Sequence, residues 1–278
     1  MIIVEPCAGL GNRFIALASA YHAAKQLNRE LAVIWKEESV LGAPMNTLIK
    51  LPKEVTCIEI SEYGFKRDLF GQLAGNRIKK KYRALAGKFY ECDEIMKLYD
   101  EKGVEGIALE FGKFPVVYVK ATNPFWDILE TEHAFDFILP QETIEAKKNK
   151  VLAAAEGKRM VSVHIRRTDH IEAWKNSPLR LFVDRMKKEL EQNEATYFYL
   201  ATDDIETEET LREVFGERII TFSGKTLDRD SRQGIQDAYV ELLCLASGER
   251  ILGSFNSTFS VMASKLGNIP LEVMKLEQ

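Results

Sequence analysis

The second half of the chain alternates short apolar runs with amphipathic segments, and this alternation restricts the possible folds more than any other feature. Residues 160–164, 196–201, 218–222 and 250–253 read as strands, and residues 179–192, 206–215, 235–246 and 258–266 read as helices between and after them. Strands that alternate with helices build parallel sheets from βαβ units. We therefore expect an α/β domain with a parallel sheet in this half.

A second βαβ pattern opens the chain. Residues 1–5 and 30–35 are apolar runs, and between them lie a glycine turn at residues 8–12 and apolar residues at helical spacing over residues 14–27. Further along, residues 61–113 look largely helical, residues 116–120 read as a strand, and residues 142–158 read as a helix. The predicted class is α/β and GT-B-like, with two Rossmann-like domains facing a cleft. They comprise residues 1–150 and residues 151–278.

Composition argues against several classes of protein. A formal net charge of −4 over 278 residues is unlike the basic surface of a nucleic-acid binder, so we expect no nucleic-acid partner. No run of 18 apolar residues indicates a transmembrane helix, and the N-terminus lacks the pattern of a signal peptide, so we expect a cytoplasmic location. The cysteines lack CxxC spacing, which predicts reduced thiols and no metal site. These cysteines are Cys7, Cys57, Cys92 and Cys244.

Ligands of parallel sheets bind beyond the carboxyl ends of the strands, so the residues after each expected strand are the first candidates for a site. After the first strand comes Gly-Leu-Gly-Asn-Arg-Phe, which begins like a dinucleotide fingerprint but has Phe14 where the third glycine should stand. This disfavours an NAD site. A glycine turn at a helix N-terminus can still receive a phosphate, and the alternative is a plain tight turn. The candidate ligand contacts are Gly9, Gly11, Asn12 and Arg13.

Tandem arginines follow the strand at residues 160–164. Arg166 and Arg167 lie two and three positions after His164, with Asp169 close behind. Arginine is rarely buried without an anionic partner, and its planar fork suits a diphosphate better than lysine does. The alternative is an internal pair with Asp169 that only joins loops.

Two other strand ends carry small polar residues. Thr202, Asp203 and Asp204 follow the next strand, where acidic residues cap a helix or orient a basic neighbour. A metal role is disfavoured there, because the adjacent aspartates lack the spacer of a DxD motif. The segment after residues 250–253 opens a helix and suits a phosphate cradle, with an ordinary N-cap as the alternative. Its candidates are Asn256, Ser257 and Thr258.

A basic segment lies in the expected helical region. It reads as a solvated helix face or as a contact to an acceptor or to a membrane surface. Its members are Arg77, Lys79, Lys80, Lys81, Arg83 and Lys88.

Taken in order, these segments resemble the GDP-fucose fucosyltransferase superfamily, which includes α1,2- and α1,6-fucosyltransferases and nodulation and O-fucosyltransferases. Residues 164–169, His-Ile-Arg-Arg-Thr-Asp, look like its HxRRxD motif, and residues 9–12 are similar to its GLGNQ turn, with Arg13 replacing the glutamine. Residues 256–260 resemble the NSSFS element of the α1,2 group. Residues 199–204 and the helix around Glu241 resemble the α1,6 group. Residues 40–150 match none of these elements, and we expect them to supply acceptor loops.

The resemblance implies a GT-B fold in which the C-terminal domain holds the donor, GDP-fucose. It implies an inverting transfer of fucose to a glycan hydroxyl without a metal or another cofactor. Arg166 would hold the β-phosphate, and His164 and Glu241 would contact guanine. Two other functions remain open: a GT-B transferase that uses another nucleotide sugar, and a catalytically silent nucleotide-binding module.

Inversion needs a general base for the acceptor hydroxyl. In the α1,6 enzymes a glutamate shortly after HxRRxD serves, and here Glu172 is nearest, although it lies one position earlier. We take Glu172 as the expected base, with His170 as a relay or alternative. Glu5, at the end of the first expected strand, is the third candidate.

Overall fold

The computed structural model describes residues 1–61, 69–167 and 171–276, without the side chains of residues 69–76 and 171–173. The chain forms two compact units. Unit 1 comprises Met1–Gln141 and Asp228–Gln236, and unit 2 comprises Glu142–Leu227 and Asp237–Gln278. The chain thus returns to unit 1 for nine residues, where the sequence predicts one break near residue 150. The roles predicted for the two domains stay predictions.

Unit 1 contains a five-stranded parallel sheet in the order β4-β2-β1-β6-β5 and a small antiparallel pair, β3 with β7. Its elements are β1 (Ile2–Pro6), α1 (Leu10–Gln26), β2 (Leu31–Glu37), η1 (Met45–Thr47), β3 (Ile49–Lys50), β4 (Val55–Ser61), α3 (Leu69–Leu85), β5 (Lys88–Tyr90), α4 (Cys92–Gly112), β6 (Val117–Ala121) and β7 (Leu139–Pro140).

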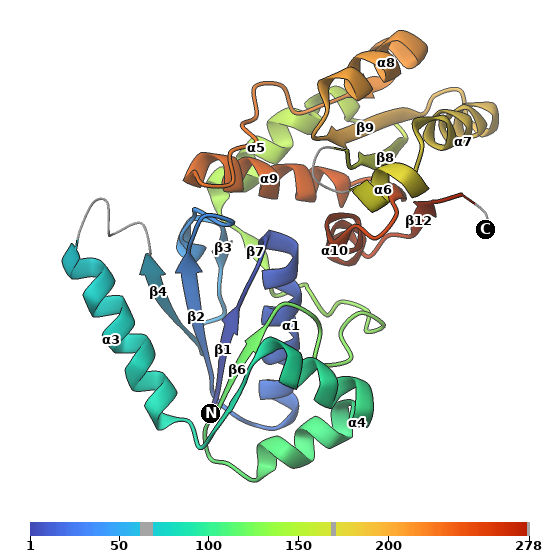
Figure 1. The fold of residues 1–278 in the computed structure, drawn as a ribbon. Coiled ribbons are helices and arrows are strands. Elements are labelled where there is room, and N and C mark those ends of the chain that lie inside the picture. Colours follow the sequence, from blue (N-terminus) through green and yellow to red (C-terminus); the bar gives the residue numbers. More distant parts are fainter. Residues whose placement is uncertain (62–68, 168–170, 277–278) are drawn as a thin grey trace. The chain divides into compact units, whose positions relative to one another are not determined.

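Apolar side chains on both faces of these strands give unit 1 its core. Ile3, Ile34 and Tyr118 are buried on one face of the sheet. Tyr82 of α3 packs against them, and Figure 1 shows α3 running alongside β4. Burial on both faces explains why β1 and β2 read as continuous apolar runs rather than as alternating ones.

Unit 2 contains a second five-stranded parallel sheet, in the order β10-β9-β8-β11-β12. Its elements are α5 (Glu142–Leu152), η2 (Ala153–Ala155), β8 (Met160–Ile165), α6 (Ile171–Asn176), α7 (Leu179–Gln192), β9 (Tyr197–Thr202), α8 (Ile205–Phe215), η3 (Gly216–Arg218), β10 (Ile219–Ile220), α9 (Arg232–Leu245), β11 (Ile251–Ser254), α10 (Thr258–Gly267) and β12 (Leu271–Met274). The first turn of α9 belongs to unit 1.

Helices cover both faces of the unit 2 sheet. Figure 1 shows α7 and α8 on one side of β8 and β9, with α9 and α10 on the other. On the first side, Phe182 of α7 and Leu211 of α8 pack against Val163 of β8 in one buried cluster. On the second side α10 lies so close to β11 that a Cβ on Gly253 would come within 2.8 Å of Ser260. Glycine therefore lets α10 approach the sheet at this position.

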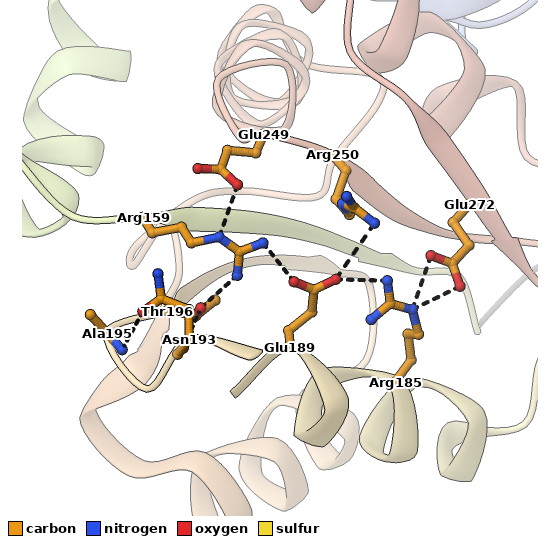
Figure 2. A network of polar contacts seen from close by, with 9 residues as sticks. All are labelled: Arg159, Arg185, Glu189, Asn193, Ala195, Thr196, Glu249, Arg250 and Glu272. Carbon is orange, nitrogen blue, oxygen red and sulfur yellow. Dashed lines mark hydrogen bonds and ion pairs between the residues drawn. The ribbon is translucent and has the colours of Figure 1, made fainter. Parts of the chain in front are cut away.

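Charged residues meet at the amino ends of the unit 2 strands (Figure 2). Glu189 of α7 has a side chain that is 0% exposed and pairs with Arg159 and Arg185, each at 2.7 Å. Arg250 approaches the same carboxylate at 3.7 Å. Arg159 precedes β8 and Arg250 precedes β11, so the network joins a helix to the starts of two strands. The outer members are Glu249 and Glu272.

The unit 2 sheet has the strand order of a doubly wound Rossmann sheet. The unit 1 sheet shares the first half of that order, β4-β2-β1, but places β6 next to β1 and the earlier strand β5 at the edge. Two parallel sheets of this kind confirm the predicted α/β, GT-B-like class. In each sheet the order reverses between two central strands: β1 and β6 in unit 1, and β8 and β11 in unit 2. Ligands of such sheets bind at this switch point, outside the carboxyl ends of the strands.

The described part of residues 61–113 is largely helical, as expected, and consists mainly of α3 and α4; β5 separates these two helices as an edge strand. Two further strands, β4 and β12, lie where the sequence predicts none. Over the described ranges of the chain, none of the helices has both the length and the apolar character to cross a bilayer.

Candidate functional site

The switch point of unit 2 brings together two segments that the sequence singled out. The backbone N–H of Arg166, just after β8, donates to the hydroxyl of Ser254 at the end of β11, with 3.0 Å between N and Oγ. The same hydroxyl donates to the carbonyl of His164 at 3.3 Å. The arginine segment and the segment that opens α10 are thus joined at neighbouring strand ends.

Arg166 lies at this edge with a partly exposed side chain. Its Nε is 3.4 Å from Oδ2 of Asp203, and the two side chains are 20% and 16% exposed. Asp203 also accepts the backbone N–H of Arg167 at 2.8 Å. Asp203, which follows the end of β9, therefore contacts both arginines of the loop and can orient it.

Arg167 has a different environment from Arg166. Its Nη1 donates to the carbonyl oxygens of Arg166, at 3.2 Å, and Ser177, at 3.0 Å. Burial lowers the pKa of Arg167, and the charges of Asp204 and Asp203 oppose that shift. The second arginine thus fastens the loop to the residue that follows α6. The internal pair with Asp169, the alternative given by the sequence, involves a residue outside the described ranges.

His164 is a buried, neutral imidazole. Its Nδ1 lies 2.7 Å from the hydroxyl of Ser260 and 3.5 Å from that of Ser257, and its ring is 5.1 Å from the ring of Phe259. Burial, followed by the charge of Arg166, lowers the pKa of His164 to about 3. At neutral pH it can offer one donor and one acceptor, but no positive charge.

The start of α10 lies beside His164. Asn256 has a left-handed backbone (φ 52°), Ser257 is the N-cap residue, and Thr258 begins the helix. Amide groups at a helix N-terminus carry partial positive charge and can receive a phosphate. The arrangement fits the predicted cradle.

Glu241 of α9 is paired with a lysine that the sequence analysis missed. Nζ of Lys225 lies 2.5 Å from Oε1 of Glu241 and donates to the carbonyl of Thr202 at 3.1 Å. Burial raises the pKa of Glu241, and Lys225 opposes the shift. A lysine in a loop after a short strand carries no local signal, so only the fold identifies it.

The two aspartates after β9 have different structural roles. Asp204 is the N-cap of α8, where its Oδ2 accepts the N–H and hydroxyl of Thr207 at 2.9 and 2.5 Å. Its own N–H donates to Oγ1 of Thr202 at 3.3 Å. Asp204 thus caps α8, and Asp203 contacts the two arginines.

Arg13, predicted as a ligand contact, lies inside unit 1. Its side chain is 0% exposed and ion-paired with Glu38 at 2.6 Å. Its Nε donates to the carbonyl of Ala8 at 2.9 Å and its Nη1 to that of Lys36 at 2.5 Å, while the guanidinium lies 5.0 Å from the ring centre of Trp35. Its fork thus joins the turn after β1 to the end of β2. We therefore omit Arg13 from the donor site proposed below.

The other residues of the glycine turn, Gly9, Gly11 and Asn12, have different surroundings. Gly9 has φ −73°, and a Cβ built on it would meet nothing within 4 Å. Neither backbone strain nor packing therefore requires a glycine at this position. Gly11 is buried in the first turn of α1, and the side-chain amide of Asn12 donates to the carbonyl of Thr122, just after β6, at 3.0 Å. The turn is thus fixed at the switch point of unit 1.

Glu5 at the end of β1 is buried and fully engaged. One carboxylate oxygen pairs with Nζ of Lys79 of α3, and the other accepts the hydroxyl of Tyr118 at 2.5 Å. Burial and the charge of Glu5 raise the pKa of Tyr118. In the basic segment, Lys79 therefore points inward, and Arg83 lies 3.9 Å from the ring centre of Phe89.

Three predicted residues fall where the structure gives no side chain. Asp169 and His170 lie outside the described residues, and Glu172 belongs to α6 without a described side chain. In the part of the chain that is described, His, Cys, Asp and Glu form no group of three or more that could hold a metal ion.

Comparison with solved structures places this site in a known fold. NodZ α-1,6-fucosyltransferase soaked with GDP-fucose matches with a TM-score of 0.62 at 15% identity, over 95% of this chain and 92% of that chain. NodZ from Bradyrhizobium matches with a TM-score of 0.63 at 14% identity, over 95% and 93%. POFUT1 in complex with GDP-fucose matches with a TM-score of 0.57 at 14% identity, over 99% and 98%. The chain has the fold of these fucosyltransferases.

At this level of identity the likeness establishes the fold. The resemblance that the motifs indicate is thereby confirmed at the level of architecture. No family model and no curated protein matches the sequence.

Proposed function

We propose that this protein is a glycosyltransferase that moves fucose from GDP-fucose to a glycan hydroxyl, with inversion and without a metal. One observation supports this more than any other: a partly exposed Arg166, oriented by Asp203, stands at the switch point of unit 2. The same fold occurs in a fucosyltransferase soaked with GDP-fucose.

The leaving group of the proposed reaction is a diphosphate that gains negative charge as the glycosidic bond breaks. The fork of Arg166 and the amides at the start of α10 supply fixed positive charge at one edge of the sheet. Groups that bind this charge more strongly in the transition state than in the substrate accelerate the step. They take the place of a metal ion in the proposal.

We assign recognition of the guanine ring of the donor to Glu241 and the neutral His164. Guanine presents N1–H and N2–H₂ side by side, and a carboxylate can accept both. Lys225 holds one oxygen of Glu241 and so favours the ionised form against the effect of burial. Uracil lacks this donor pair, so the buried carboxylate would keep Lys225 but gain no hydrogen bonds from the nucleotide.

The acceptor hydroxyl attacks the anomeric carbon from the face opposite the diphosphate. A carboxylate takes the hydroxyl proton as the new C–O bond forms and the bond to GDP breaks, and we assign this role to Glu172. His170 stays the alternative relay. The donor contacts predicted for Asp169, Gly9, Gly11 and Asn12, a peripheral contact through residues 77–88, and a cytoplasmic location stay predictions.

Thermal shift with GDP, UDP and CMP tests the proposal directly. A nucleotide at 100 times its dissociation constant adds about 2.7 kcal/mol to the free energy of unfolding, and we expect this from GDP at concentrations where UDP and CMP have little effect. Glu241→Gln, which keeps the shape but loses the charge, should remove the preference. Equal stabilisation by UDP would show that the base assignment is wrong.

Turnover of GDP-fucose separates an enzyme from a silent binding module. We expect release of GDP from GDP-fucose in EDTA at the same rate as in Mg²⁺ or Mn²⁺. Loss of turnover in EDTA that a divalent ion restores would contradict metal independence. Binding of GDP without any turnover would favour the module.

A further inference from the structure

One large aromatic side chain of the chain is exposed in unit 2. Trp174 is 60% exposed, whereas Trp35 is 0% and Trp126 is 3% exposed, and these are the three tryptophans of the sequence. A tryptophan normally buries its large ring or uses it in an interface. The exposure of Trp174 therefore suggests that its ring binds a partner.

Trp174 stands on the segment that carries the arginines. It belongs to α6, which follows β8, and it comes eight residues after Arg166. The end of α6 is fixed to the candidate site. The carbonyl of Ser177 accepts Nη1 of Arg167 at 3.0 Å, and its hydroxyl accepts the N–H of Phe255 at 2.8 Å.

The same helix end is tied to the last strand of the sheet. The hydroxyl of Ser177 donates to the carbonyl of Met274 at 2.5 Å, and the carbonyl of Asn176 accepts the N–H of Leu276 at 2.9 Å. These contacts connect the end of α6 with the arginine loop, with the segment that opens α10 and with β12. Trp174 is thus an exposed ring two residues from a fixed point of the site.

We propose that Trp174 is a stacking platform for a pyranose ring of the acceptor glycan. The inference rests on the proposed function, because it takes the donor as bound through Arg166 and Glu241, which leaves the acceptor as the partner for the ring. A pyranose with equatorial hydroxyls exposes a flat face of C–H groups. A rigid indole covers such a face with a large contact area at low conformational cost. Trp174 then selects acceptors by the shape of one sugar face.

Intrinsic fluorescence offers a direct test, since acrylamide reaches exposed indoles and two of the three tryptophans are buried. We expect that chitotetraose, cellotetraose or N-acetyllactosamine, added in the presence of GDP, shifts the emission to the blue and reduces acrylamide quenching. Trp174→Phe should remove the signal and retain the stacking. If none of the three sugars changes the emission or the quenching, the proposal is wrong.

Kinetics test the same idea with an independent readout. For whichever sugar accepts fucose, Trp174→Ala should raise the acceptor KM at least about tenfold, the loss expected for one aromatic hot spot. Trp174→Phe should recover most of that loss. Release of GDP to water and the thermal shift by GDP should be unchanged in both variants. Leu109→Ala, which truncates a 73% exposed side chain in unit 1, is the matched control and should behave as the wild type.

Two further outcomes would overturn the proposal. If Trp174→Ala weakens GDP binding as much as it weakens acceptor use, the ring belongs to the donor site. If the wild type is a dimer by sedimentation and Trp174→Ala is a monomer, the ring covers a second copy of the chain. Failure of the proposed function looks different, since GDP would then have no preference over UDP and CMP in the thermal shift, or GDP-fucose would not turn over, whatever the sugars do to the emission.

Discussion

Two adjacent arginines at the end of β8 have unlike environments, and this difference makes the role of each testable. The side chain of Arg166 is 20% exposed and contacts Asp203 through Nε, whereas Nη1 of Arg167 donates to two backbone carbonyls. We therefore predict that the first arginine binds the ligand and that the second holds the loop.

We predict that Arg166→Lys is nearly as damaging as Arg166→Ala. Lysine keeps the charge but loses the fork that grips a phosphate bidentately. The expected loss in turnover of GDP-fucose is about 10²–10³-fold, the usual cost of removing one donor to a developing charge. Arg180→Lys, on the exposed side of α7, is the control. A rate for Arg166→Lys near that of the wild type would exclude Arg166 as the diphosphate clamp.

His164 makes the stability of unit 2 depend on pH. Its pKa is about 3 in the folded protein, lowered mainly by burial from an ordinary value of 6.5. Between these two values the unfolded chain binds a proton that the folded protein does not, so stability is complete above pH 6.5 and falls as the pH drops towards 3. The loss from this residue between pH 7 and pH 5 is about 2 kcal/mol.

Urea unfolding at pH 7 and pH 5 measures this effect. His164→Asn removes the titrating group, so the difference between the two pH values should shrink by about 2 kcal/mol, whatever the variant costs in absolute stability. An unchanged difference would mean that His164 is protonated in the folded protein. It would then carry a charge beside Arg166.

At the scale of elements, the chain predicts its long helices and central strands well. Residues 179–192 are predicted and observed as a helix, and the buried strands β1, β2, β8, β9 and β11 coincide with apolar runs. β5 and β12 were missed because three or four residues at the edge of a sheet leave too short a pattern. β4 reads Val-Thr-Cys-Ile-Glu-Ile-Ser, and its β-branched residues were a usable signal.

The sequence predicts those residues of the candidate site that directly follow a strand. It does not predict contacts between residues that only the fold brings together. His164, Arg166 and Ser257 follow strand ends, so the rule for parallel sheets was enough to group them. The contact of Lys225 with Glu241 spans 16 positions and depends on how a loop returns to α9. Arg13 shows the converse, because a basic residue in a glycine turn suggests a ligand until its buried partners are known.

The network around Glu189 should dominate the stability of α7. Burial disfavours its ionised form, but Arg159 and Arg185 outweigh that effect and hold its pKa below the usual value. Glu189→Gln leaves these arginines without their shared counterion, and breaking a buried pair in this way costs about 3–5 kcal/mol.

Denaturant unfolding of two matched variants checks this. Glu191→Gln, an exposed change in the last turn of the same helix, should cost less than about 0.5 kcal/mol. Binding of GDP by the folded Glu189→Gln protein should be normal, because the network lies at the amino ends of the strands. If the two variants are equally stable, the network contributes nothing to the fold.

Across the whole molecule, the fold is similar to that of the solved fucosyltransferases although few residues are identical. Identities of 14–15% accompany TM-scores of 0.57–0.63 over at least 95% of the chain. The two switch points are where the polar residues meet, with the arginine segment in unit 2 and the glycine turn in unit 1. Core positions need only the right size and polarity, whereas residues at a switch point must present particular groups to a ligand.

The last prediction asks which unit supplies the general base. We expect Glu172→Gln to lower turnover by about 10²–10⁴-fold while the affinity for GDP changes only a few-fold, because the amide keeps the shape but cannot take a proton. Glu172 follows the arginine loop closely in the sequence, whereas both oxygens of Glu5 are already engaged by Lys79 and Tyr118.

Glu5→Gln should therefore reduce thermal stability and leave the turnover of the folded protein largely intact. His170→Asn, measured beside it, separates a relay from a bystander. A relay would slow transfer to the glycan acceptor without affecting GDP binding. Should Glu172→Gln turn over normally while folded Glu5→Gln does not, the base belongs to unit 1.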